Sequence, residues 1–127
     1  RLVNNFINWC KQQDFYENTT IVIAGDHCSM SNSIDEMLIG DDRTVFLTIL
    51  NPYEQKTENI DRECCTFDLY PTTVSSLGIK FENNRLGLGT NLFSNEKTLC
   101  EKYGKDKFFS LVKANSTYYM ALIKFVM

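Results

Sequence analysis

Apolar side chains recur every three or four positions over residues 1–13, at Val3, Phe6, Ile7 and Cys10. This spacing places them on one face of a helix. The sequence therefore predicts an amphipathic helix at the start of the chain.

Two short runs of apolar and β-branched residues predict buried strands. They are TTIVIA at residues 19–24, which ends at Gly25, and VFLTIL at residues 45–50, which ends at Asn51-Pro52. Strands that are apolar on both faces usually lie in sheets that are covered on both sides. The pattern therefore favours an α/β fold.

Helical spacing returns after a polar loop at residues 53–63, with apolar side chains at Phe67, Tyr70, Val74 and Leu77. Asp68 is expected to cap the amino end of this helix, and Pro71 suits its first turn. Gly78 suits the carboxyl-terminal cap. The sequence therefore predicts a helix between Asp68 and Gly78.

The end of the chain predicts a helical tail from about residue 96, with short helices at 97–103, 106–113 and 116–126. The length of 127 residues suits one domain. The chain begins with Arg rather than Met and closes on the apolar run YYMALIKFVM, which holds no stop signal. We therefore expect residues 1–127 to be a piece of a longer protein.

Composition excludes some classes of protein. A hydrophobic content of 43% excludes a mainly disordered chain, and a net charge of −3 excludes a strong electrostatic footprint for nucleic acid. No apolar run has the roughly 20 residues that span a bilayer. The five cysteines form no CxxC pair, and their odd number leaves at least one thiol unpaired within the chain. We interpret Cys64 and Cys65 as buried small apolar residues beside Phe67. Zinc ligation or a strained disulfide at Cys64-Cys65 is the alternative.

The pair Asp26-His27, at the end of the first predicted strand, is the best candidate for chemistry. A carboxylate and a neutral imidazole are competent ligands for a divalent metal such as zinc or manganese. The two side chains can share one ion only if the backbone turns, which Gly25 permits. The alternative interpretation is a capping Asp beside a structural His. Asp35, Asp41 and Asp42 could contribute further ligands, but a solvated face is the favoured interpretation of these residues. Cys28 as a third consecutive ligand is sterically awkward.

Other motifs are less informative. No serine or threonine lies in a nucleophile motif such as GxSxG. The turn LGLG at residues 86–89 lacks the GxGxxG spacing of a nucleotide site. Arg43, Arg62 and Arg85 lie in or before turns and could hold an anion, but exposed arginines usually only carry solubilising charge.

Three segments, NTTIVIAGDH, TFDLYPTTVSSLGI and NRLGLGTNLFS, resemble the carboxyl-terminal part of the alkaline phosphatase/sulfatase superfamily in their order and spacing. The phosphoglycerol transferase and lipoteichoic acid synthase branch is the most similar. The segment GDDRTVFLTILNP resembles the strand between the first two motifs, and TLCEKYGKDKFFSLVKANSTYYMALI resembles the helical tail of the glucan-specific type. The resemblance covers most of residues 15–123.

The resemblance implies a partial alkaline-phosphatase-like sandwich, in which a few-stranded sheet is flanked by helices. It implies one catalytic divalent metal held by Asp26 and His27, with manganese expected first and magnesium or zinc as alternatives. A threonine nucleophile and a further carboxylate would lie upstream, in the remainder of the catalytic domain. They would transfer phosphoglycerol or phosphoethanolamine from a membrane phospholipid to a glycan or lipid acceptor. The site would face outward from a bacterial cell membrane, and the 127 residues alone would be inactive.

The chain departs from the pattern of the superfamily in one position and leaves alternatives open. Cys28 stands where many members carry a small residue. Arg62 and Arg85 are weak candidates for contacts with phosphate or glycan. A sulfatase or phosphodiesterase on the same fold is the enzymatic alternative, although no cysteine here lies in a Cys-x-Pro-x-Arg segment. The other alternative is a non-catalytic interaction module with the same fold.

Overall fold

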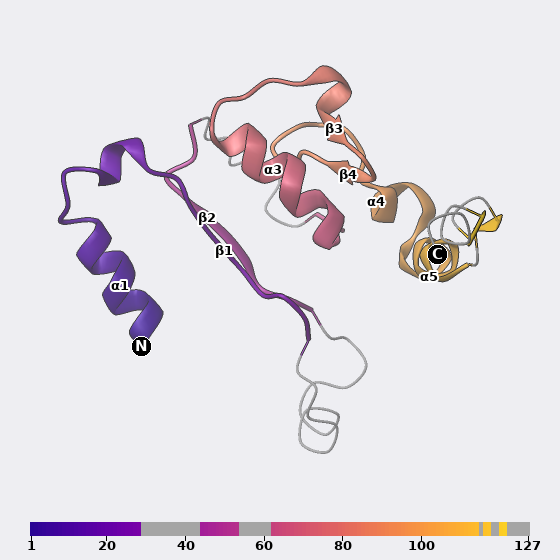
Figure 1. Ribbon diagram of the computed structural model, residues 1–127, viewed down its shortest axis with the longest axis horizontal. Coiled ribbons are helices and arrows are strands. Elements are labelled where there is room, and N and C mark those ends of the chain that lie inside the picture. Colours follow the sequence, from indigo (N-terminus) through magenta and orange to yellow (C-terminus); the bar gives the residue numbers. More distant parts are fainter. Residues whose placement is uncertain (29–43, 54–61, 115, 118–119, 122–127) are drawn as a thin grey trace, which may run out of the picture. The chain divides into compact units, whose positions relative to one another are not determined.

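The structure is a computed structural model that describes residues 1–28, 44–53, 62–114, 116–117 and 120–121 (Figure 1). The chain divides into two compact units. The first unit comprises Arg1–Gln55 and Thr73–Ile79, and the second comprises Lys56–Thr72 and Lys80–Met127.

The first unit opens with helix α1, Leu2–Cys10. The predicted helix is confirmed, but it ends three residues before the expected position 13, because the chain continues in tighter turns. The amides of Gln12 and Gln13 donate to the carbonyls of Trp9 and Cys10. A short 3₁₀ helix, η1, follows at Tyr16–Asn18. Of the apolar residues in α1, only Cys10 is buried among the described residues.

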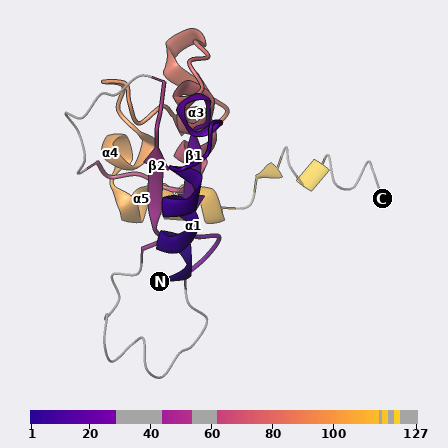
Figure 2. The same cartoon turned by 90° about the vertical axis from the view of Figure 1, so that its left-hand side faces the viewer.

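Strands β1, Ile21–Ala24, and β2, Leu47–Leu50, form an antiparallel pair in which Ile21 lies opposite Leu50 and Ala24 opposite Leu47. They run side by side as a ribbon in Figure 1 and again in the view of Figure 2. The amide of Gly25 donates to the carbonyl of Phe46 at 2.8 Å and extends the pairing by one residue.

Both predicted strands are confirmed, whereas the sheet that was expected to be covered on both faces is not found. Within the described residues the two strands are half-buried or exposed, and Phe46 beside them is 61% exposed. The fold is mixed α/β, with helices and two separate two-stranded antiparallel sheets rather than one sheet flanked by helices. The apolar residues of β1 and β2 predicted that both faces of the sheet would be buried, but a sheet of two strands alone cannot bury its own faces.

Asn51 fixes the end of the ribbon to the turn that precedes it. Its backbone is left-handed, with φ 54°, a conformation that Asn adopts more readily than most residues. Its side-chain amide donates to the carbonyls of Tyr16, at 2.8 Å, and Thr19, at 3.1 Å. The Thr20 hydroxyl donates back to the carbonyl of Asn51 at 3.0 Å. These bonds join the start of β1 to the end of β2.

Helix α3, Leu69–Ser76, follows the 3₁₀ turn η2, Thr66–Asp68, and confirms the predicted helix. The cap differs from the prediction. Cys65 occupies the N-cap position, and the Asp68 carboxylate reaches back from the third position to accept the Cys65 amide at 2.9 Å. The boundary between the two units falls inside α3, after Thr72.

In the second unit the short turn η3, Glu82–Asn84, leads into a small hairpin of β3, Arg85–Leu86, and β4, Gly89–Thr90. The turn LGLG therefore connects two strands, in agreement with its interpretation as a poor nucleotide site. Gly89 is buried against η2, and a Cβ atom there would lie 2.0 Å from the carbonyl oxygen of Phe67. Only glycine allows this close approach.

The tail contains α4, Leu99–Tyr103, and α5, Lys105–Lys113, which confirm two of the three predicted tail helices. Most of the third, at 116–126, lies outside the described residues. Phe108 of α5 is buried and packs edge-on against Phe67, with ring centroids 6.2 Å apart. In the part of the chain that the structure describes, no helix is both long and apolar enough to cross a bilayer.

Candidate functional site

The end of β1 positions the predicted metal ligands. The strand pairing holds the backbone in register through Gly25, and the chain then bends at Asp26 and His27. Consecutive residues of a regular strand point to opposite faces. The bend removes this restriction and allows the two side chains to lie on the same side.

Asp26 and His27 converge. The Oδ2 atom of Asp26 lies 3.4 Å from the Nε2 atom of His27, and its Oδ1 atom accepts the backbone amide of His27 at 2.9 Å. Both side chains are open to solvent, with exposed fractions of 87% for Asp26 and 58% for His27. The two residues therefore present one carboxylate oxygen and one ring nitrogen to a common, accessible point.

A second contact orients the imidazole. The Nδ1 atom of His27 lies 2.8 Å from the carbonyl oxygen of Cys28. Because a carbonyl can only accept a hydrogen bond, Nδ1 carries the hydrogen. In a neutral ring the lone pair is then on Nε2, which faces the Asp26 carboxylate. Histidine ligands of metals are commonly oriented by this type of hydrogen bond on the far nitrogen.

This pair fits a divalent metal ion in both chemistry and spacing. Two ligand atoms that bind one ion at about 2.1 Å lie about 3.0–3.4 Å apart for octahedral and tetrahedral angles. The observed separation of 3.4 Å lies within this range. When the ring is neutral, two lone pairs face each other, and a cation between them would relieve that repulsion.

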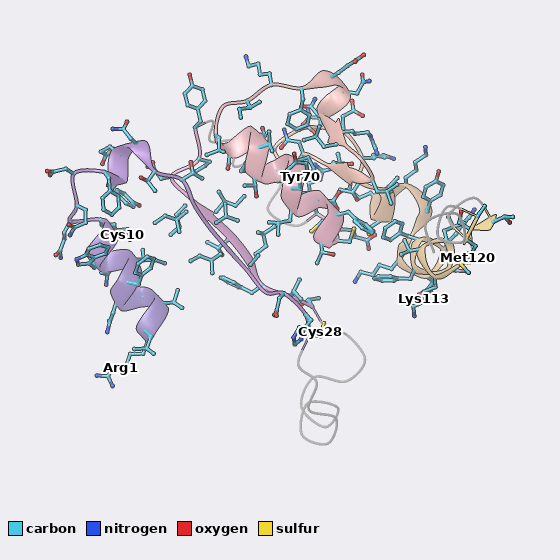
Figure 3. All side chains as sticks on the ribbon, in the orientation of Figure 1. Arg1, Cys10, Cys28, Tyr70, Lys113 and Met120 are labelled. Carbon is cyan, nitrogen blue, oxygen red and sulfur yellow. The ribbon has the colours of Figure 1, made fainter. Side chains whose placement is uncertain are left out.

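The described residues supply only part of a metal site. Among residues 1–28, 44–53, 62–114 and the few described beyond them, no group of three or more His, Cys, Asp or Glu side chains can hold a metal. The predicted helpers Asp35, Asp41 and Asp42 lie outside the described residues, as does Arg43. Cys28 lies at the far end of the β1–β2 ribbon (Figure 3) and contacts His27 through its carbonyl oxygen.

Arg62, one of the two weak candidates for phosphate contacts, is bound within the second unit. Its five N–H groups donate to Glu101 Oε1 at 3.0 Å, Glu101 Oε2 at 2.7 Å, and the carbonyls of Leu92 at 3.2 Å, Ser94 at 2.8 Å and Glu96. The hydrogen bond from Arg62 lowers the pKa of Glu101, although burial opposes the shift. A phosphate group at Arg62 would have to compete with these partners.

Arg85, the other candidate, lies in β3 and is half-buried. One of its terminal nitrogens donates to the carbonyl of Lys97. This bond ties the hairpin to the segment before α4.

The sequence interpretation missed a hydrogen-bonded network around Asp68. Its carboxylate accepts the amides of Thr90, at 2.7 Å, and Cys65, at 2.9 Å. The Thr72 hydroxyl donates to the Asp68 carbonyl at 2.6 Å and accepts the Leu92 amide at 3.0 Å. These bonds join the motif TFDLYPTT to the motif LGLGTNLF.

The sequence interpretation missed a second feature, although a local sequence motif could have revealed it. Thr98 and Glu101 form a capping box at the start of α4, in which each side chain accepts the backbone amide of the other, at 2.8 and 3.0 Å. The pattern Thr-x-x-Glu before a helix predicts this arrangement. The attachment of Arg62 to the same glutamate carries no such signal, because 39 residues separate them.

Comparison with curated proteins finds similarity to phosphoglycerol transferase I of Escherichia fergusonii and of Salmonella choleraesuis. Each is 30% identical over 94 residues, which are 74% of this chain and 12% of the relative. The chain thus spans about an eighth of the length of these curated relatives. No family model matches the chain, and no solved structure matches it. The similarity confirms the predicted resemblance to phosphoglycerol transferases.

Proposed function

From its relation to phosphoglycerol transferase I, we propose that this chain is the metal-binding, carboxyl-terminal part of a phosphoglycerol-transferase-like enzyme. Asp26 and His27 are two ligands of one divalent ion. The observation that carries this proposal is the convergence of Asp26 Oδ2 and His27 Nε2 at 3.4 Å on an exposed bend after β1.

Each residue of the pair has a defined task. The Asp26 carboxylate supplies negative charge and also accepts the His27 amide, which keeps the bend closed. The Cys28 carbonyl holds the hydrogen on Nδ1 of His27, so that Nε2 is the ligating nitrogen. An oxygen and an imidazole nitrogen suit manganese, magnesium or zinc, and we expect manganese first. When bound, such an ion neutralises charge on phosphoryl oxygens and activates a hydroxyl nucleophile.

The complete reaction requires residues outside this chain. A threonine in the remainder of the catalytic domain would accept phosphoglycerol or phosphoethanolamine from a membrane phospholipid and pass it to a glycan or lipid acceptor. The remaining metal ligand would come from the same part of the protein. We propose that the full protein acts at the outer face of a bacterial cell membrane.

Substitution of the pair in the full-length protein tests this function. We expect Asp26→Ala and His27→Ala each to lower transfer of labelled phosphoglycerol by at least about 100-fold and to lower the bound metal content. Glu17→Gln is the matched control, since Glu17 is an exposed acidic residue of the same unit. Circular dichroism should show an unchanged fold, because both side chains are exposed.

Two outcomes would overturn the proposal. Full transfer activity in both variants would show that the pair is not part of the catalytic centre. Loss of phosphoglycerol from the lipid without any acceptor dependence would instead indicate a hydrolase on the same fold.

A further inference from the structure

Three of the five cysteines gather in the second unit, where Cys64, Cys65 and Cys100 lie close enough to influence one another. The side chains of Cys65 and Cys100 lie close enough for each to shift the pKa of the other. Cys65 is the N-cap residue of η2, and Cys100 lies in the first turn of α4. Two cysteines 35 positions apart in sequence are therefore neighbours in the second unit.

The backbone on both sides of this pair is fixed. The Arg62 guanidinium binds the Glu101 carboxylate through two hydrogen bonds, and the Thr98 hydroxyl donates to the Glu63 carbonyl at 2.5 Å. The Asp68 carboxylate holds the Cys65 amide. The segments 62–65 and 98–101 thus lie side by side, which brings Cys65 into the neighbourhood of Cys100.

We propose that Cys65 and Cys100 form a disulfide when the protein meets an external disulfide such as oxidised glutathione. The Cys65 thiolate attacks the external disulfide, whose S–S bond breaks and releases one thiol. The Cys100 thiolate then attacks the Cys65 sulfur and releases the second thiol. Two protein thiols and one external disulfide thereby become one protein disulfide and two external thiols.

The pairing of Cys64 with Cys65 is the less favourable alternative. Adjacent Cα atoms across a trans peptide are about 3.8 Å apart, whereas the Cα atoms of a disulfide are usually about 4.4–6.8 Å apart. Cys64 is exposed, whereas the Cys65 side chain is half-buried and lies nearer to that of Cys100, which it influences most among the neighbouring thiols.

Burial determines the order of the two steps. Cys100 is 2% exposed, and burial raises the pKa of its thiol to about 12. Its thiolate is therefore scarce at neutral pH, and an external disulfide cannot easily reach it. Burial raises the pKa of the Cys65 thiol as well, but Cys65 is only half-buried and is the thiol that an external disulfide can reach. Cys65 therefore reacts first, and closure onto Cys100 is the slower step.

Oxidation of the full-length protein tests this inference. The protein is incubated with oxidised or reduced glutathione, then alkylated in denaturant and mapped by mass spectrometry. We expect a linked pair of peptides that contain Cys65 and Cys100 in the oxidised sample only. The closed loop should raise the melting temperature by roughly 10 °C.

Variants distinguish this link from other thiol reactions. Cys64→Ser should retain the link and the rise in melting temperature, whereas Cys65→Ser and Cys100→Ser should lose both. Alkylated Cys100 in oxidised wild-type protein would overturn the proposal, and so would a link from Cys64 to Cys100. The wild-type peptide map decides the question even where a variant fails to fold, and it does not depend on the proposed transferase activity.

Discussion

Two aspartates, one in each unit of the chain, play opposite parts. In the second unit Asp68 is 1% exposed, and its carboxylate binds two backbone amides. In the first unit Asp26 is exposed, and its carboxylate points to the neighbouring imidazole. One aspartate joins segments of the fold, whereas the other is available to a ligand.

This difference indicates where substitutions should affect stability and where they should affect activity. Removal of a buried acceptor leaves its donors without partners, which costs more than the average hydrogen bond contributes. Removal of an exposed side chain leaves water to solvate what remains. We therefore expect Asp68→Ala to lower the stability of the fold, and Asp26→Ala to lower activity with little effect on stability.

The largest loss of stability is expected for Asp68→Ala. It leaves the amides of Thr90 and Cys65 without their acceptor and should lower the free energy of unfolding by about 3–5 kcal/mol. Urea denaturation of the full-length protein measures this change, with Asp14→Ala as an exposed control. A loss below about 1 kcal/mol would show that the two units do not differ in this way.

A smaller loss is expected for Arg62→Lys, which keeps the charge but removes the planar fork that binds Glu101. We expect about 2–3 kcal/mol, because the guanidinium is nearly buried and a lysine cannot replace its bonds to three carbonyls. Denaturation and transfer activity should be measured together. Normal stability with lost transfer would mean that Arg62 contacts substrate instead.

The smallest loss of stability is expected when the pH is lowered. The hydrogen bond from Arg62 holds the pKa of Glu101 below its usual 4.5, so the ionised form is favoured in the folded state. Its contribution is therefore present above about pH 4.5 and is lost as the pH falls through the lowered folded pKa. Wild type should lose more stability than Glu101→Gln between about pH 6 and pH 3. If the free energy of unfolding fell equally with pH in the wild type and in Glu101→Gln, this prediction would be contradicted.

The sequence predicted the local parts of both units better than their connections. The runs TTIVIA and VFLTIL indicated strands, but nothing in either run specifies that they pair with each other and remain half-exposed. Asp68 was expected at a helix start, yet its second role depends on Thr90, which lies 22 residues further on. Long-range bonds of this kind leave no periodic signal.

The pairing of Asp26 with His27 could be anticipated because the two residues are neighbours in the sequence, whereas their role as metal ligands stays a prediction. Gly25, Asp26 and His27 follow a strand directly, and only the bend that brings the side chains together required the structure. The proximity of Cys65 and Cys100 was not predictable, because their spacing matches no cysteine motif. The interpretation of Cys64 and Cys65 as buried residues is also wrong for Cys64, which is exposed, whereas Cys65 is half-buried.

Gly89 limits how far this segment can vary. Its neighbour across the hairpin, Leu86, has a side chain, whereas at position 89 even one methyl group would overlap the carbonyl oxygen of Phe67. Alanine, the most conservative replacement, would therefore separate β4 from η2 and break the bond between Thr90 and Asp68. Any sequence that adopts this fold therefore requires glycine at position 89.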